Sequence, residues 1–150
     1  MQLAYANGTN IGVMSSSVAA IVVSFLLLSA CDSESSSAQQ SSNVTDVEVE
    51  AAHQLLSGDS PPIVLDVRTP EEFSASHIAG ARNINVLADD FAQGIGELDR
   101  SQPYLVHCAA GAAGGRSKQA VEQMRAMGFE NVYHLEGGFN AWGAVGKPTE

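Results

Sequence analysis

The chain has 150 residues, of which 17 are acidic and 7 are Lys or Arg, so that its formal net charge is −10. This acidity argues against nucleic acid as a partner, because a nucleic-acid-binding protein needs a basic face to meet phosphates. Two cysteines as far apart as Cys31 and Cys108 do not suggest a disulfide framework, and no Cys/His cluster has zinc spacing, so we expect no metal and no other cofactor.

Residues 1–30 are predicted to be a signal peptide. Val18 to Leu28 is an 11-residue run with Ser24 as its single polar member, which is too short for a membrane span of roughly 20 apolar residues. The run leads into Leu28-Ser29-Ala30-Cys31, which resembles the lipobox of bacterial lipoproteins, whose cysteine is lipidated and becomes the first residue after cleavage. No Lys or Arg precedes the run, so an uncleaved anchor reaching back to about Ile11 stays open as an alternative.

Residues 31–43 are predicted to form a Ser-rich tether. Asp32 to Asn43 reads D-S-E-S-S-S-A-Q-Q-S-S-N and contains almost nothing apolar that could be buried. A lipid on Cys31 would hold the following domain close to a membrane. The lipobox resemblance therefore implies a lipid-anchored protein of the cell envelope that faces the periplasm or the exterior. Asp32 after the cysteine resembles an inner-membrane retention signal known from some bacteria.

Residues 44–150 show alternating helix and strand signals. Helix starts are predicted at Thr45, with Glu48 completing a capping box, and at Thr69-Pro70; Asp89 to Leu98 is a further predicted helix. A last long helix is indicated by one apolar face, made by Ala120, Val121, Met124 and Met127. Short apolar runs predict buried strands at Ile63 to Leu65, Tyr104 to Val106 and Val132 to Leu135. This alternation predicts an α/β fold with a mainly parallel central sheet flanked by helices.

The candidate site is the stretch from His107 to Ser117, H-C-A-A-G-A-A-G-G-R-S, which follows the predicted strand at Tyr104. Ligands of parallel sheets bind beyond the carboxyl ends of strands, and Cys108 lies at such an end. Converging backbone N–H groups and the start of the next helix favour a thiolate, so Cys108 is the predicted nucleophile, with an inert buried cysteine as the alternative. The residues predicted to bind an anionic substrate are Ala109, Ala110, Gly111, Ala112, Ala113, Gly114, Gly115, Arg116 and Ser117.

Four separated patterns, in order, resemble the rhodanese domain over about residues 44–146. They are V-L-D-V-R at Val64 with P-E-E-F at Pro70, H-I-A-G-A-R-N-I at His77, the loop at Cys108, and L-E-G-G-F-N-A-W at Leu135. The resemblance implies a rhodanese-like three-layer fold and a sulfurtransferase. In that chemistry Cys108 takes sulfane sulfur from a small anionic donor such as thiosulfate, becomes a persulfide, and passes the sulfur to a thiol or to cyanide. Asp66 and Arg68 are expected to hold neighbouring loops.

The loop departs from this family in length. Seven residues separate Cys108 from Arg116, three more than in the usual rhodanese loop, and Ala-Ala-Gly occurs twice in a row within them. Two alternatives therefore stay open. One is a weakly active or inactive rhodanese-fold binding module, and the other is an oxyanion enzyme of the same fold, a phosphatase or an arsenate reductase. Removing one triplet is expected to raise thiosulfate sulfurtransferase activity.

The histidines are predicted to be structural. His77 is expected to pack in a turn. His107 is expected to point away from the Cys108 pocket, because adjacent residues of a strand face opposite sides. His53 and His134 show no local partner in the sequence.

Overall fold

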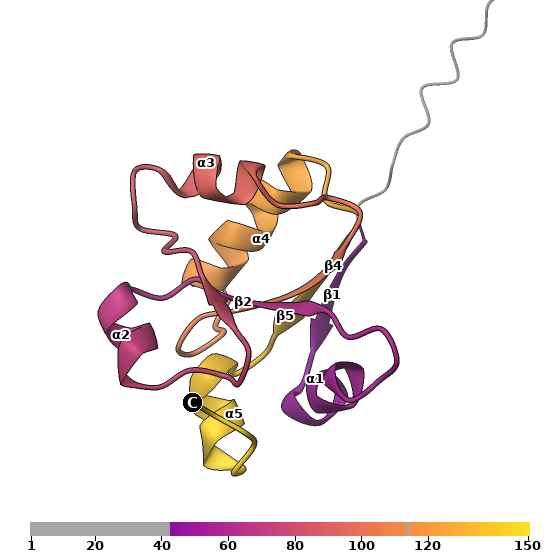
Figure 1. Cartoon of the computed structure of the whole chain (residues 1–150), viewed down its shortest axis with the longest axis vertical. Coiled ribbons are helices and arrows are strands. Elements are labelled where there is room, and N and C mark those ends of the chain that lie inside the picture. Colours follow the sequence, from indigo (N-terminus) through magenta and orange to yellow (C-terminus); the bar gives the residue numbers. More distant parts are fainter. Residues whose placement is uncertain (1–42, 114) are drawn as a thin grey trace, which may run out of the picture. The chain divides into compact units, whose positions relative to one another are not determined.

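The computed structural model describes residues 43–113 and 115–150, so the predicted signal peptide, Cys31 and Gly114 lie outside the described residues. Strands and helices alternate along this part of the chain (Figure 1). The strands are β1 (Asn43–Val47), β2 (Ile63–Asp66), β3 (Arg82–Asn83), β4 (Pro103–His107) and β5 (Asn131–Leu135). The helices are α1 (Val49–Leu56), α2 (Pro70–Ala75), α3 (Phe91–Gly96), α4 (Arg116–Ala126) and α5 (Gly138–Ala144).

All neighbouring strands of the sheet are parallel, in the order β1-β5-β4-β2-β3. This confirms the predicted α/β class with a parallel central sheet, and the three apolar runs predicted as strands are β2, β4 and β5. Helices α3 and α4 contribute to the core on one face, while Ala52 of α1 and Trp142 of α5 contribute to the core on the other. None of the helices in the described part of the chain combines the length and apolar character of a membrane span.

The first element is a strand, and the prediction that Thr45 caps a helix is wrong. Thr45 pairs with Tyr133 in β5, and α1 begins at Val49 without a side-chain cap from Glu48. The physical reason is burial on both sides of the sheet, because Val44 packs against one core and Val47 against the other. These contacts, with the backbone ladder to β5, outweigh a local capping signal.

The structure confirms one predicted helix start and shortens another predicted helix. The predicted start at Thr69 is confirmed: its hydroxyl accepts a hydrogen bond from the Glu72 N–H at 3.3 Å, and Glu72 accepts one from the Thr69 N–H at 3.1 Å. This capping box fixes the backbone of Glu72 in the first turn of α2. The predicted helix over 89–98 is shorter in the structure, because α3 begins at Phe91 and ends at Gly96.

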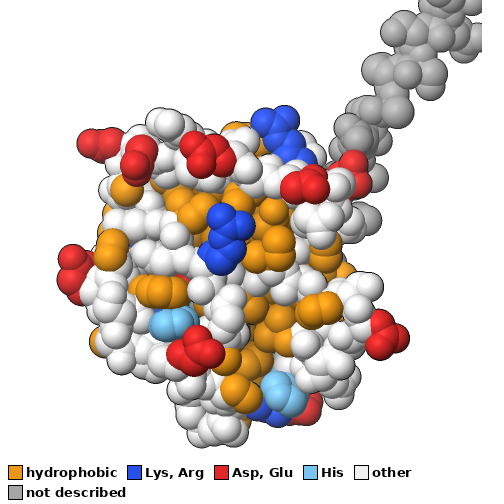
Figure 2. All heavy atoms as spheres, in the orientation of Figure 1, with side chains coloured by type: hydrophobic (Ala, Val, Ile, Leu, Met, Phe, Trp, Pro, Cys, Tyr) orange, Lys and Arg blue, Asp and Glu red, His pale blue; other side chains and the backbone are white. Residues whose placement is uncertain are grey.

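The surface seen in Figure 2 carries Asp and Glu side chains, most of them toward its margin, while the Lys and Arg side chains there form no extended patch. Orange apolar side chains lie between the charged ones, in a chain of which 45% of the residues are hydrophobic. This face therefore presents no broad cationic surface.

Candidate active site at Cys108

Cys108 follows β4 directly and is 4% exposed, so its thiol lies inside the core rather than on the surface. Its Sγ atom is 3.2 Å from the hydroxyl oxygen of Ser117, in the first turn of α4. Burial raises the pKa of the Cys108 thiol, but hydrogen bonds from the Ser117 hydroxyl and from backbone N–H groups more than offset it. Those N–H groups belong to Ser117, Gly111 and Ala110, and the net pKa of the thiol is below its ordinary value. The arrangement favours a thiolate.

The first Ala-Ala-Gly triplet, 109–111, is fixed to the core by the start of α5. The Phe139 N–H donates to the Cys108 carbonyl and the Asn140 N–H to the Ala109 carbonyl, both at 2.9 Å. Gly111 has φ +55°, and a Cβ at this position would lie 2.7 Å from the Gly138 nitrogen. Only glycine fits both this conformation and this close approach of two backbones. The amides that surround the thiol are therefore held in place by tertiary contacts.

Beyond Gly111 the loop leaves the core at Ala112 and Ala113. Ala112 and Ala113 are exposed, and the Gly115 N–H donates to the Ala112 carbonyl at 2.9 Å, which closes a turn. That hydrogen bond commits the Gly115 N–H within the loop, so this donor is not free to meet an anion beside Cys108. The described part of the loop thus makes an outward turn at Ala112 and Ala113.

Arg116, predicted to bind the substrate, forms a two-point ion pair with Glu72. The Nη atoms of Arg116 donate to the two carboxylate oxygens at 2.6 and 2.9 Å. The hydrogen bonds from Arg116 are the main reason that the pKa of Glu72 falls to about 2, and the charge of Cys108 is a smaller contribution to the raised pKa of Arg116. Both side chains stay partly exposed, at 26% for Arg116 and 34% for Glu72. The guanidinium is therefore oriented by Glu72 and remains reachable by an anion.

Sequence reasoning missed the contact between Glu72 and Arg116. The two residues are 44 positions apart, and the capping box accounts only for the hydrogen bond between the Glu72 carboxylate and the Thr69 N–H. The P-E-E-F pattern indicates a helix start, and nothing local in it indicates that the carboxylate also pairs with Arg116.

Asp66 and Arg68 join the end of β2 to its neighbours. The Arg68 guanidinium donates to both Asp66 carboxylate oxygens, at 2.6 to 3.0 Å, and to the Ser76 carbonyl at 2.8 Å. The Asn83 side-chain amide donates to the carbonyls of Asp66 and Arg68, each at 2.9 Å. Both charged side chains are buried and link β2 to the end of α2, while the Asn83 amide links β3 to the backbone of the same segment.

Two histidines lie next to this centre with different surroundings. His107 is fully buried and its Nδ1 lies 3.2 Å from the Cys108 carbonyl. Its ring stacks near Phe139, which packs on the core opposite that of Cys108. His134 has two partners that are distant in the sequence: its Nε2 is 2.9 Å from the Ser117 hydroxyl oxygen and its Nδ1 is 2.9 Å from the Asp46 carboxylate. The sequence could not indicate these contacts, since Asp46 is 88 positions away.

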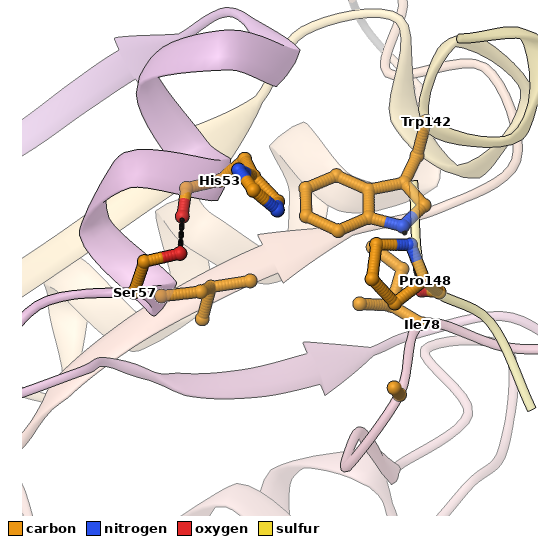
Figure 3. A pocket seen from close by; sticks show the side chains of 7 residues that line it. His53, Ser57, Ile78, Trp142 and Pro148 are labelled. Atoms are coloured by element: carbon orange, nitrogen blue, oxygen red, sulfur yellow. Dashed lines mark hydrogen bonds between the residues drawn. The ribbon is translucent and has the colours of Figure 1, made fainter. Parts of the chain in front are cut away.

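A cavity of about 200 Å³ lies elsewhere, between α1 and α5 (Figure 3). His53 and Trp142 lie beside one another in its lining, with their ring centroids 5.9 Å apart, and the Trp142 indole N–H donates to the Pro148 carbonyl at 2.9 Å. No residue that lines this cavity belongs to the stretch from His107 to Ser117. The Cys108 thiol is therefore not part of this cavity.

Comparison with known proteins assigns the family. The family model described as Rhodanese-like domain matches residues 48–145. Thiosulfate sulfurtransferase 16, chloroplastic, of Arabidopsis thaliana is 34% identical over 123 residues, which cover 75% of this chain and 98% of that protein. Thiosulfate sulfurtransferase GlpE of Shewanella oneidensis is 37% identical over 79 residues, which cover 53% of this chain and 73% of that protein.

Solved structures agree with the sequence relatives. The rhodanese-like domain of the Alr3790 protein from Anabaena sp. has a TM-score of 0.61 at 31% identity, over 70% of this chain and 77% of that one. A rhodanese-related protein from Thermoplasma volcanium has a TM-score of 0.61 at 28% identity, over 71% of this chain and 97% of that one. The chain belongs to the rhodanese-like domain family.

Proposed function

We propose that this protein is a sulfurtransferase in which Cys108 carries sulfane sulfur from a small anionic donor, such as thiosulfate, to a thiol or cyanide. The observation that carries the proposal is the Cys108 thiol itself, whose pKa is lowered by the Ser117 hydroxyl and by backbone N–H groups despite its burial. A thiolate held by fixed dipoles is the nucleophile that this reaction needs. Relatives named thiosulfate sulfurtransferases support the choice of reaction.

The reaction would proceed in two displacements. The Cys108 thiolate attacks the sulfane sulfur of thiosulfate, a Cys–S bond forms, and the S–S bond of the donor breaks so that sulfite leaves with the electron pair. The acceptor then attacks the terminal sulfur of the persulfide, and the Cys108 thiolate leaves. The same N–H groups stabilise the thiolate, the persulfide anion and the leaving thiolate, while Arg116 pairs with an oxyanion of the donor.

Replacing Cys108 with Ser is expected to abolish the formation of thiocyanate from thiosulfate and cyanide. The hydroxyl is a far weaker nucleophile, and it cannot form a persulfide. The assay follows thiocyanate release by the full chain and by the Cys108→Ser variant, and circular dichroism checks that both are folded. Thiocyanate formation that survives the substitution would exclude Cys108 as the sulfur carrier.

A weakly active binding module is the second candidate, and one observation favours it. The turn at Ala112 engages the Gly115 N–H, which leaves fewer donors for an anion at Cys108. A module of this kind would bind thiosulfate or sulfite without turnover, so calorimetric binding in the absence of thiocyanate formation would favour it. Hydrolysis of an aryl phosphate that is lost in Cys108→Ser would instead favour an oxyanion enzyme.

We further propose that Cys31 is lipidated and holds the domain at a membrane of the cell envelope. The support is the sequence alone, the apolar run from Val18 to Leu28 followed by L-S-A-C, since these residues lie outside the described ones. In a bacterial host, the full chain is expected to incorporate labelled palmitate and to partition into detergent, and Cys31→Ser is expected to lose both properties. Equal labelling of the two forms would contradict lipidation at Cys31.

A further inference from the structure

A chain of side-chain contacts runs from the Cys108 thiol to the protein surface. Sγ of Cys108 is 3.2 Å from Oγ of Ser117, which is 2.9 Å from Nε2 of His134, whose Nδ1 is 2.9 Å from Asp46. The Ser117 and His134 side chains are fully buried, whereas the Asp46 side chain is 45% exposed. This series of contacts thus links the buried Cys108 thiol to the solvent-exposed Asp46 carboxylate.

Three elements and the residue that follows β4 contribute these four side chains, and the sheet fixes the contact between His134 and Asp46. Asp46 of β1 and His134 of β5 are directly paired in the parallel register of the two strands. Neighbouring strands lie about 4.8 Å apart, so register partners on one face can bond to each other. Ser117 reaches His134 from α4, and Cys108 follows β4.

The donors and acceptors along the chain are coupled. The Asp46 carboxylate only accepts, so Nδ1 of His134 carries a proton, and Nε2 of the neutral ring is an acceptor toward Ser117. Ser117 has a single hydroxyl proton, which can be donated either to His134 or to the Cys108 sulfur. The thiolate therefore gains the full hydrogen bond from Ser117 when Nε2 of His134 has itself taken up a proton.

We propose that His134 and Asp46 are positioning residues of a proton relay, in which Ser117 passes the Cys108 proton to His134. The S–H bond of Cys108 breaks as its proton joins the Ser117 oxygen, and the Ser117 O–H bond breaks as its proton joins Nε2 of His134. The products are a thiolate, a neutral serine and an imidazolium paired with the Asp46 carboxylate. The inference rests on Cys108 being the reacting thiol of the proposed function.

The charges that face His134 determine how far the proton moves. Burial lowers the pKa of His134, and the nearby Lys118 ammonium adds to this effect, while Asp46 and Glu136 oppose it. Lys118 pairs with Asp46 and is the main cause of the lowered pKa of that carboxyl, with His134 a smaller one. The lowered pKa of His134 favours a neutral ring whose Nε2 is free of a proton, and the lowered pKa of Asp46 favours a carboxylate, which opposes the cost of forming the imidazolium.

The test measures the ionisation of Cys108 without using sulfur transfer. In the full chain with Cys31→Ser, Cys108 is the only thiol, and the rate of alkylation by iodoacetamide across pH gives its apparent pKa. Asp46→Asn and His134→Gln are each expected to raise this midpoint by about one pH unit, which is about tenfold less thiolate below the midpoint. The double variant is expected to show the same shift as each single one, because both break one relay.

Glu50→Gln is the matched control. It also removes an exposed carboxylate that pairs with a lysine, Lys147, but Glu50 is not part of the relay, and its midpoint is expected to equal that of the parent. Asp46→Asn preserves side-chain shape at an exposed position, so the test does not depend on His134→Gln folding. Unchanged midpoints in folded Asp46→Asn would overturn the relay. A shifted midpoint without sulfur loading from thiosulfate would support the relay and contradict the proposed function. Sulfur loading with unchanged midpoints would support the proposed function and contradict the relay.

Discussion

Gly111→Ala is expected to lower the free energy of unfolding by about 3 kcal/mol and to reduce sulfur transfer at least about tenfold. A Cβ at this position would lie 2.8 Å from the Gly137 nitrogen and 2.7 Å from the Gly138 nitrogen, in a backbone conformation with φ +55°. Backbone cannot move aside as a flexible side chain can, so the loop must shift. The Gly111 N–H that helps to lower the pKa of Cys108 would move with it. Urea unfolding and the thiocyanate assay measure the two effects.

Gly80→Ala is the control for Gly111→Ala, because it introduces backbone strain without a steric clash. Gly80 has φ +75°, but a Cβ there would meet nothing within 4 Å. Its substitution carries only the cost of a left-handed alanine, about 1 kcal/mol, and is expected to leave activity unchanged. Equal destabilisation by the two substitutions would mean that the contact of Gly111 with α5 does not hold the loop.

Deleting one Ala-Ala-Gly triplet is expected to raise kcat/KM for thiosulfate by about tenfold, the effect of roughly one additional charge-directed hydrogen bond. The deletion removes the turn in which the Gly115 N–H donates to Ala112, and it frees that donor to face the anion at Cys108. The change in loop entropy is small, since shortening a loop by three residues alters its closure cost by a fraction of a kcal/mol.

Steady-state kinetics of the shortened and full-length loops provide the measurement. Cys108→Ser in the shortened chain is the control, and its inactivity would show that both forms use one nucleophile. Equal or lower kcat/KM after the deletion would mean that the second triplet is accommodated or useful, and that the outward turn does not withhold a needed donor.

Local signals in the sequence were sufficient for most of the fold. The apolar runs at Ile63, Tyr104 and Val132 are buried strands, and Thr69 caps α2, because burial and capping depend on neighbouring residues. One exception is β1, where a helix signal at Thr45 is overridden by pairing with β5. An edge strand gains its stability from a partner far along the chain, and no local pattern records that partner.

The candidate site likewise combines residues that the sequence indicates locally with residues that only the fold brings together. Cys108 and its loop form one contiguous stretch, so the sequence indicates this candidate nucleophile directly. The groups that orient this centre, Glu72 on Arg116 and His134 with Asp46 behind Ser117, are brought there by the sheet register and by packing of helices. Their sequence separations of 44 and 88 positions place them beyond any local reading of the chain.

The most direct test of sulfur transfer through Cys108 is the mass of the protein after incubation with thiosulfate and removal of the excess thiosulfate. Sulfur transfer through Cys108 predicts a gain of one sulfur atom, located on the peptide that contains Cys108, removed by cyanide with release of thiocyanate, and absent in Cys108→Ser. Thiosulfate-treated protein that carries no added sulfur on that peptide, or carries the sulfur on another residue, would contradict sulfur transfer through Cys108.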